Sequence, residues 1–243
     1  MSRFYAPRDN IRGNLIYIDG REARHILRVM RLKEEDTVIV FDGTGKEYTG
    51  FIKEAKTKSL IVEIVSTKTP TAGNFPDITL VQAIPKKDKM DYIIEKATEL
   101  GVRSVMPILS ERTVTRTKDD KKDAKVERWR KIATEAAKQC GRLDVPEIKN
   151  IRKFYNAVDA VNDYDLALMA CVSEKTMPLK ESLSDFETGK IIVFVGPEGD
   201  FTPEEIDMAK DTSCKLVSLG SRILKSDTAG LYLLSVLNHE LSR

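Results

Sequence analysis

The sequence predicts a small β-rich barrel followed by an α/β domain whose sheet is mainly parallel. Short β-type runs dominate the chain before residue 66, and apolar strand-like runs alternate with helical patterns after residue 77. Between them, residues 66–77 are poor in apolar side chains and rich in Pro, Thr and Gly, as linkers between domains are. We therefore expect two domains, residues 1–72 and 73–243.

The first domain contains three predicted strands, at residues 37–41, 48–52 and 60–65. The first two flank Asp42-Gly43-Thr44-Gly45, whose two glycines permit either a phosphate-binding loop or a hairpin turn. We favour the hairpin, because Asp-Gly between alternating apolar runs is typical of tight turns.

The second domain contains predicted strands at residues 78–84, 105–109, 166–170, 191–195 and 216–219. A helix at 89–100 carries its apolar residues on one face and ends at Gly101. A helix at 125–139 includes Trp129 in its apolar stripe, so we expect this ring in a core or an interface. Thr202 and Glu205 form a predicted capping box, and a last helix begins at Ser226 or Asp227.

Composition excludes several classes of protein. The chain of 243 residues has 40 Lys and Arg against 38 Asp and Glu, and residues 1–72 carry the basic bias, 13 against 10. Three cysteines and two histidines show neither C-x-x-C nor H-x-x-x-H spacing, so we expect no metal site and a reducing compartment. No apolar run approaches the roughly 20 residues that span a bilayer, which favours a soluble, cytoplasmic protein without a membrane partner.

Four arginines at spacings of three, four and three form a predicted basic stripe on a helix: Arg21, Arg24, Arg28 and Arg31. The apolar residues Ala23, Ile26, Leu27, Val29 and Met30 are expected on the opposite side, and His25 borders the stripe. Arginine binds phosphate bidentately, which favours a nucleic acid. A solvated amphipathic helix with scattered ion pairs is the alternative.

Two glycine turns, at residues 195–199 and 219–224, each follow an apolar run. Glycine lets the main chain approach a ligand closely, because no Cβ intervenes. Neither G-x-G-x-x-G nor G-x-x-x-x-G-K-[ST] is present. The turns therefore predict a pocket for a ligand other than a pyrophosphate, and the missing fingerprint argues against a nicotinamide dehydrogenase.

The motifs Gly-Pro-Glu-Gly at 196–199 and Leu-Gly-x-Arg-Ile-Leu-Lys-Ser-Asp-Thr-Ala at 219–229 resemble the C-terminal signature of SPOUT-class RNA methyltransferases. The nearest resemblance is to the 16S ribosomal RNA uridine-N3 methyltransferase family, and it extends to residues 3–5, 25–31, 96–102 and 139–142. It implies a PUA-like barrel, a C-terminal trefoil knot, a homodimer, S-adenosylmethionine as cofactor and 16S rRNA of the small ribosomal subunit as partner.

The resemblance implies a cofactor site at Val195, Gly196, Pro197, Glu198, Gly199, Leu219, Gly220, Ile223, Leu224, Thr228 and Ala229, with Ile223 and Leu224 as walls against adenine. It implies RNA contacts at Arg3, Arg21, Arg24, His25, Arg28 and Arg31. Methylation at N3 requires a uracil anion, and we expect Arg112 and Arg142 to stabilise it. The chain departs from the family pattern at Asp200, Lys225 and Asp227, where glycine, arginine and glutamate are usual.

Two other functions fit the same motifs. A related SPOUT enzyme methylates the ribose 2′-oxygen of transfer RNA, and a non-catalytic ribosome assembly factor would need a spoiled cofactor pocket. The motifs at 3–5 and 25–31 favour the uridine-N3 enzyme. For the homodimer, the helix with Trp129 and the last helix, with Leu231, Leu234 and Leu241, are the candidate contact faces.

Overall fold

Two sheets of different kinds organise the chain in the computed structural model, which describes residues 3–69, 76–114, 121–173 and 175–242. The chain divides into one unit of Met1–Ala72 with Thr134–Val145 and a second unit of Gly73–Ala133 with Pro146–Arg243. Residues 134–145, which sequence analysis assigned to the second domain, are thus grouped with the first sheet. Half of the predicted linker, residues 70–75, lies outside the described residues.

The first unit is built on a six-stranded mixed sheet of order β1-β4-β5-β6-β3-β2. Strands β1 and β4 pair in parallel, and the other neighbours are antiparallel. The strands are β1 (Arg3–Tyr5), β2 (Ile11–Arg12), β3 (Leu15–Asp19), β4 (Thr37–Phe41), β5 (Glu47–Lys56) and β6 (Ser59–Lys68), and the short helix η1 is Arg8–Asn10. The three predicted strands are confirmed as β4, β5 and β6, and β6 extends into the predicted linker.

The loop between β4 and β5 is a hairpin turn, as predicted. The carboxylate of Asp42 accepts hydrogen bonds from the Thr44 N–H at 2.8 Å, the Lys46 N–H at 3.3 Å and the Tyr48 hydroxyl at 3.1 Å. Gly43 and Gly45 have positive φ angles of 78° and 103°, which glycine adopts at little cost. The N–H groups of Thr44 and Lys46, which a bound phosphate would need as donors, therefore already bind the Asp42 carboxylate.

The basic helix is shorter than its spacing predicted. It consists of α1 (Gly20–Arg24) and one π-helical turn, η2 (His25–Val29), after which Arg31 adopts a left-handed φ of 57°. A π turn holds more residues than an α turn, so a projection at 100° per residue fails beyond His25. The prediction that Arg31 belongs to the helix was wrong, since the helix ends at Val29. The prediction that Val29 and Met30 lie on its apolar side, opposite the arginines, was also wrong, since both side chains are exposed.

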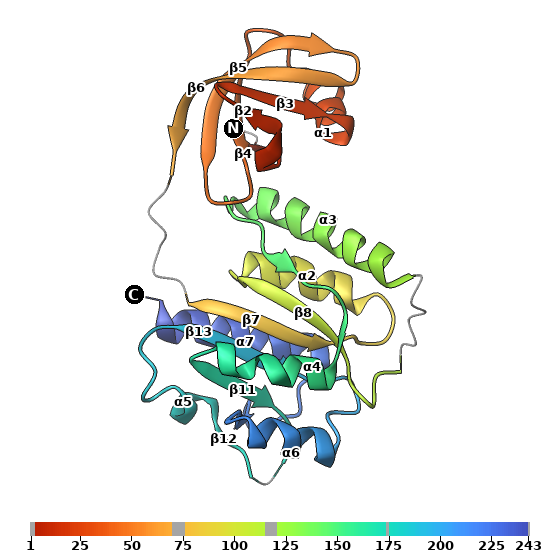
Figure 1. Ribbon diagram of the computed structural model, residues 1–243, viewed down its shortest axis with the longest axis vertical. Helices are drawn as coiled ribbons and strands as arrows, with labels where there is room; N and C mark the ends of the chain where they lie inside the picture. Colours follow the sequence, from red (N-terminus) through yellow and green to blue (C-terminus); the bar gives the residue numbers. More distant parts are fainter. Residues whose placement is uncertain (1–2, 70–75, 115–120, 174, 243) are drawn as a thin grey trace. The chain divides into compact units, whose positions relative to one another are not determined.

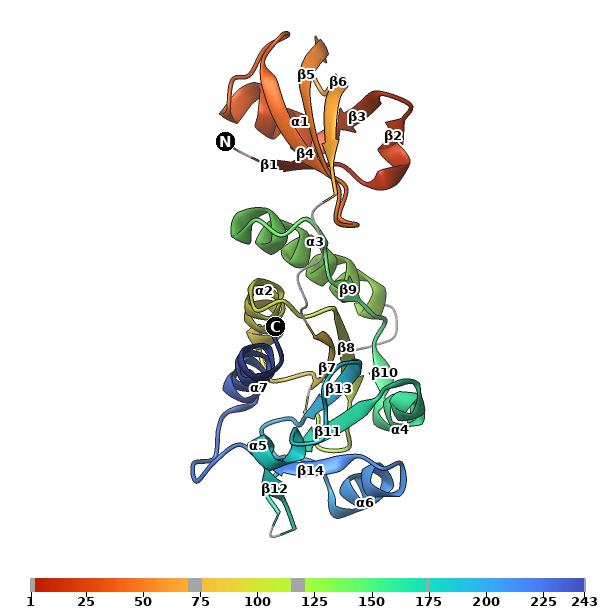
Figure 2. The same cartoon turned by 90° about the vertical axis from the view of Figure 1, so that its left-hand side faces the viewer.

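The second unit is a three-layer α/β arrangement (Figures 1 and 2). Its sheet has the order β10-β8-β7-β13-β11-β14-β12, with β9 also beside β8, and its described pairs are all parallel. The strands are β7 (Asp77–Ala83), β8 (Ser104–Leu109), β9 (Glu147–Ile148), β10 (Arg152–Lys153), β11 (Leu166–Ala170), β12 (Met177–Pro178), β13 (Lys190–Val195) and β14 (Lys215–Ser218). The predicted parallel sheet is confirmed.

Helices cover both faces of this sheet. Figure 2 shows α2 and α7 on one face and α4 and α6 on the other. The helices are α2 (Lys89–Glu99), α3 (Lys122–Cys140), α4 (Phe154–Val158), η4 (Asp159–Asp163), α5 (Leu179–Ser182), α6 (Pro203–Asp211) and α7 (Ser226–Leu241). All four predicted helices of this region are confirmed, as is the capping box of α6. None of the helices within the described ranges is long and apolar enough to cross a membrane.

Trp129 is a core residue. Its ring is buried, and its Nε1 donates a hydrogen bond to Asp91 of α2 at 3.1 Å. Leu234 of α7 is also fully buried within the unit. Neither side chain is available to a second subunit, so the expectation for Leu234 is corrected. That these two helices form the contact faces of a homodimer stays a prediction.

The capping box generates a stability prediction. The Thr202 side chain accepts a hydrogen bond from the Glu205 N–H at 3.2 Å, and the Glu205 carboxylate accepts one from the Thr202 N–H at 3.0 Å. Thr202→Ala is expected to lower the free energy of unfolding by about 1 kcal/mol, measured by urea denaturation. Thr202→Ser, which keeps the hydroxyl, is the matched control, and equal losses in both variants would contradict this role of the cap.

Candidate functional site

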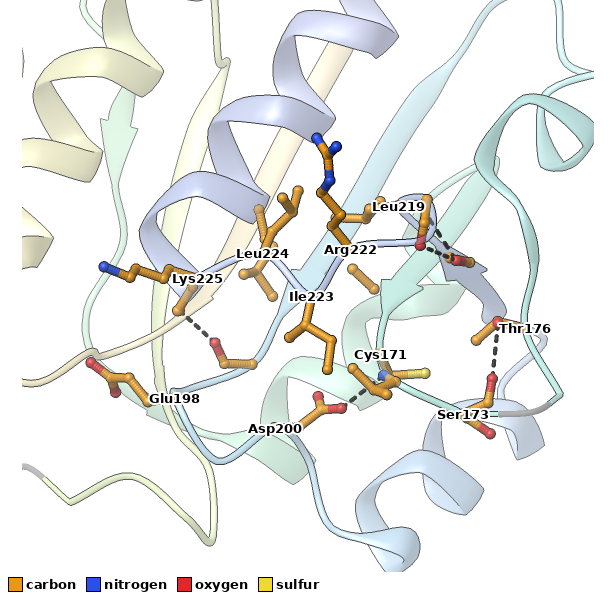
Figure 3. A pocket seen from close by; sticks show the side chains of 18 of the residues that line it. Cys171, Ser173, Thr176, Glu198, Asp200, Leu219, Arg222, Ile223, Leu224 and Lys225 are labelled. Carbon is orange, nitrogen blue, oxygen red and sulfur yellow. Dashed lines mark hydrogen bonds between the residues drawn. The ribbon is translucent and has the colours of Figure 1, made fainter.

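The main candidate site lies where three neighbouring parallel strands of the second unit end. Strands β13, β11 and β14 are adjacent, and the loops that follow them enclose a cavity of about 410 Å³ (Figure 3). Ligands of open α/β sheets bind at the carboxyl ends of strands. The lining residues are Ala170, Cys171, Val172, Ser173, Thr176, Val195, Gly196, Pro197, Glu198, Asp200, Ser218, Leu219, Gly220, Ser221, Arg222, Ile223, Leu224, Lys225, Ser226 and Ala229.

The structure brings the two predicted glycine turns together in this one pocket. Nine of the predicted cofactor residues line it: Val195, Gly196, Pro197, Glu198, Leu219, Gly220, Ile223, Leu224 and Ala229. Gly199 and Thr228 do not. Ile223 is 81% exposed on the loop beside the pocket, which is unusual for a large apolar side chain.

Sequence reasoning missed the wall formed by Cys171, Val172, Ser173 and Thr176. These residues follow β11, which was predicted as a strand. The carboxyl ends of parallel strands lie at one edge of a sheet. The predicted end of β11 was therefore the signal in the sequence that could have placed these residues in the pocket. No glycine motif marks this loop.

Buried hydrogen bonds attach the first glycine turn to helix α7. The Ser226 hydroxyl donates to the Gly196 carbonyl at 2.6 Å and accepts from the Gln82 Nε2 at 2.9 Å. Gln82 also donates to the Ala83 carbonyl at 3.1 Å, and its side chain is completely buried. Buried polar networks of this kind hold their members in one arrangement.

Glu198 at the rim of the pocket is held by the segment before α2. Its carboxylate accepts a hydrogen bond from the Lys86 N–H at 3.1 Å and lies 3.7 Å from the Lys89 ammonium. The same ammonium lies 3.7 Å from Asp227, a residue that departs from the family pattern. Lys89 thus bridges the acidic residues of the two motifs.

The two candidate catalytic arginines belong to different units. Arg112 donates from Nη1 to the carbonyl oxygens of Gly199 at 2.7 Å and Phe201 at 3.3 Å, and so supports the first glycine turn. Arg142 belongs to the first unit, where its guanidinium pairs with Asp144 at 2.6 Å. Neither contact was foreseen from sequence.

The predicted RNA-contact residues all belong to the first unit. Arg21, Arg24, Arg28 and Arg31 are exposed, and Arg24 donates to the Gly20 carbonyl. Arg3 pairs with Glu47 at 2.9 Å, and His25 meets the Phe4 ring edge to face. Arg3 and His25 also line an open cleft with the end of α3, formed by Glu135, Lys138, Gln139, Cys140 and Gly141.

The thiol in the pocket wall is not a nucleophile at neutral pH. Burial, assisted by the charge of Asp200, raises the pKa of Cys171 to about 11. Burial, assisted by Cys171, raises the pKa of Cys214 to about 12. Since the thiolate is the reactive form of cysteine, both side chains remain inert thiols. In the described part of the chain, no group of three or more His, Cys, Asp or Glu residues is arranged to hold a metal ion.

Comparison with known families covers most of the chain. The family described as RNA methyltransferase domain matches residues 73–238, and the family described as RNA methyltransferase PUA domain matches residues 18–65. The expected PUA-like domain and the expected RNA methyltransferase domain are therefore confirmed.

Individual relatives agree with these matches. The ribosomal RNA small subunit methyltransferase E of Bacillus subtilis is 30% identical over 92% of this chain and 89% of its own length. A methyltransferase of Legionella pneumophila, solved with bound S-adenosylmethionine, is 28% identical with a TM-score of 0.89 over 99% of this chain and 98% of that chain. The ribosomal RNA small subunit methyltransferase E of Neisseria gonorrhoeae, also solved with S-adenosyl methionine, is 28% identical with a TM-score of 0.86 over the same shares.

The raised pKa values generate a labelling prediction. At about pH 8, a thiol reagent is expected to modify exposed Cys140 rapidly and to spare Cys171 and Cys214, because thiolate is scarce at pH values well below the pKa. Cys140→Ser should remove the fast phase, whereas Cys214→Ser should keep it. Labelling of Cys171 should begin as the pH approaches 11, and fast labelling of Cys140→Ser at about pH 8 would contradict the assignment.

Proposed function

Because this chain belongs to the ribosomal RNA small subunit methyltransferase E family, we propose that it transfers a methyl group from S-adenosylmethionine to N3 of a uridine in 16S ribosomal RNA. The observation that carries the proposal is the meeting of both family glycine motifs in one pocket within the matched methyltransferase domain. The substrate is the small ribosomal subunit or its RNA, which places the enzyme in the cytoplasm.

The pocket has the chemistry that S-adenosylmethionine requires. The cofactor combines an adenine, a sulfonium cation and an amino acid end, and it supplies an activated methyl group when bound. Main-chain groups of the two glycine turns provide hydrogen-bonding partners for the adenine edge, and Leu219, Ile223 and Leu224 provide apolar cover. The exposure of Ile223 fits this role, since a bound aromatic ring would cover it.

Positioning and charge supply the catalysis in this proposal. The N3–H of uracil is lost only well above neutral pH, so the site must favour the anion that is spread over N3, O2 and O4. We assign this stabilisation to Arg112 and Arg142. The anchoring of Arg112 on the Gly199 and Phe201 carbonyls supports a fixed position beside the glycine turn.

The first unit holds the RNA in this proposal. Arg21, Arg24, Arg28 and Arg31 present exposed guanidinium groups that suit phosphates, and Arg3 and His25 border the cleft at the end of α3. The match to the RNA methyltransferase PUA domain supports this division of labour between residues 1–72 and 73–243.

We also infer that the enzyme is a homodimer and that its C-terminal segment forms a trefoil knot, as in the SPOUT class. Tyr92 of α2 and Tyr232 of α7 are half exposed and offer apolar contacts to a second subunit. The approach of residues 195–200 to residues 219–226 in one pocket is consistent with a knotted chain.

Product analysis tests the proposal. Small ribosomal subunits lacking the modification are incubated with labelled S-adenosylmethionine, digested and examined by mass spectrometry, and 3-methyluridine is the expected product. Gly196→Val is the matched inactive control, because even a Cβ there would lie 3.1 Å from the Asp200 carboxylate and 3.3 Å from the Phe201 ring. Label in transfer RNA ribose would favour the 2′-oxygen methyltransferase, and absence of cofactor binding would favour the assembly factor.

Kinetics of arginine variants test the assigned roles. Arg112→Ala and Arg142→Ala are each expected to lower kcat roughly 100-fold, the effect typical of losing one donor to a developing anion, with the Kd for S-adenosylmethionine nearly unchanged. Exposed Arg152 on β10 gives the control, Arg152→Ala. A normal kcat in Arg112→Ala or in Arg142→Ala would remove the substituted arginine from the mechanism. A raised Kd with normal kcat in Arg112→Ala would instead show that Arg112 only supports the glycine turn.

A further inference from the structure

Asp200 occupies a position of the first glycine turn that suits glycine. Its φ of 58° lies in the left-handed region, and its N–H donates to the Pro197 carbonyl at 3.0 Å to close the turn. Aspartate adopts this conformation more readily than most residues, though at a cost that glycine avoids. The side chain must therefore provide something that a glycine would not.

The carboxylate of Asp200 joins two walls of the pocket. One oxygen, Oδ2, accepts a hydrogen bond from the Val172 N–H at 2.8 Å, and the other, Oδ1, accepts one from the Phe201 N–H at 2.8 Å. Val172 follows β11, whereas Phe201 follows β13, so the contacts link the loop that lacks a glycine motif to the first glycine turn. The Asp200 carboxylate also gives a reason for glycine at position 196. A Cβ there would lie only 3.1 Å from Oδ1 of Asp200, which is closer than an ordinary van der Waals contact.

Asp200 also places negative charge on the pocket wall. In the described ranges, no Lys or Arg forms an ion pair with this carboxylate, whereas Glu198 on the same wall is paired with Lys89. Figure 3 shows Arg222 and Lys225 pointing away from Asp200, whereas Ile223 points toward it. This negative charge also acts on the neighbouring Cys171 thiol. Burial raises the pKa of Cys171, and the charge of Asp200 raises it further.

We propose that Asp200 is a positioning residue that makes the pocket select a cationic ligand, S-adenosylmethionine, over the neutral product S-adenosylhomocysteine. The proposal rests on the proposed function. When the S–CH3 bond breaks, its electron pair stays on sulfur, and the methyl carbon bonds to N3, whose proton has left. The sulfonium thereby becomes a neutral thioether. A fixed carboxylate near the ligand favours the cation before transfer and loses that attraction afterwards, which promotes release of the product.

Calorimetric titration of the full chain with both ligands tests this selection. The variants are Asp200→Asn, which removes the charge and tolerates the left-handed backbone, and Asp200→Gly, which removes charge and tether together. Asp207→Asn is the matched control, because Asp207 is an exposed acid of α6 that pairs with Lys210 outside the pocket. The measured quantity is the Kd for S-adenosylmethionine divided by the Kd for S-adenosylhomocysteine.

Both Asp200 variants are expected to raise this ratio about tenfold, which corresponds to ~1.4 kcal/mol, and Asp207→Asn should leave it unchanged. Loss of the tether alone would weaken both ligands equally and leave the ratio unchanged, so an unchanged ratio overturns the proposal. If Asp200→Asn fails to fold, Asp200→Gly supplies the answer, since glycine suits the turn. If the wild-type chain binds neither ligand, the proposed function itself fails, which separates the two claims.

Discussion

Parallel pairing of β13, β11 and β14 is the constraint on which the site depends. Ala170 of β11 is in register with Val195 of β13 and with Val217 of β14, so the residues that follow these strands emerge at the same edge. A shift of register in either pair would carry one loop away from the others. The sheet therefore assembles a pocket from segments that lie about 25 residues apart in the chain.

Side-chain tethers then hold the pocket loops to one another. Ser226 connects the start of α7 to the Gly196 carbonyl, and Asp200 connects the first glycine turn to Val172. Arg112 supports the same turn from the end of β8. Main-chain groups can bind a ligand selectively only if their positions are fixed, and these contacts supply that fixation.

Sequence predicted the elements that depend on local patterns. The strands β4 and β11 were predicted with the bounds that the structure shows, because each is a short apolar run of strand length. The capping box at Thr202 and both pocket turns were also predicted, since each signal lies within a few residues. The contribution of Cys171 to the pocket and the bridge from Asp200 to Val172 were not, because they arise from strand order. The π turn that begins at His25 was missed because its extra residue leaves no mark in apolar spacing.

Hydrogen–deuterium exchange with and without S-adenosylmethionine tests the location of the pocket most directly. The cofactor is expected to slow exchange in the segments at 171–173, 195–201 and 219–226, with little change in the hairpin of β5 and β6, because these segments contribute to the pocket lining and the hairpin does not. Protection confined to the first unit, or spread evenly over the chain while these loops stay unprotected, would contradict it.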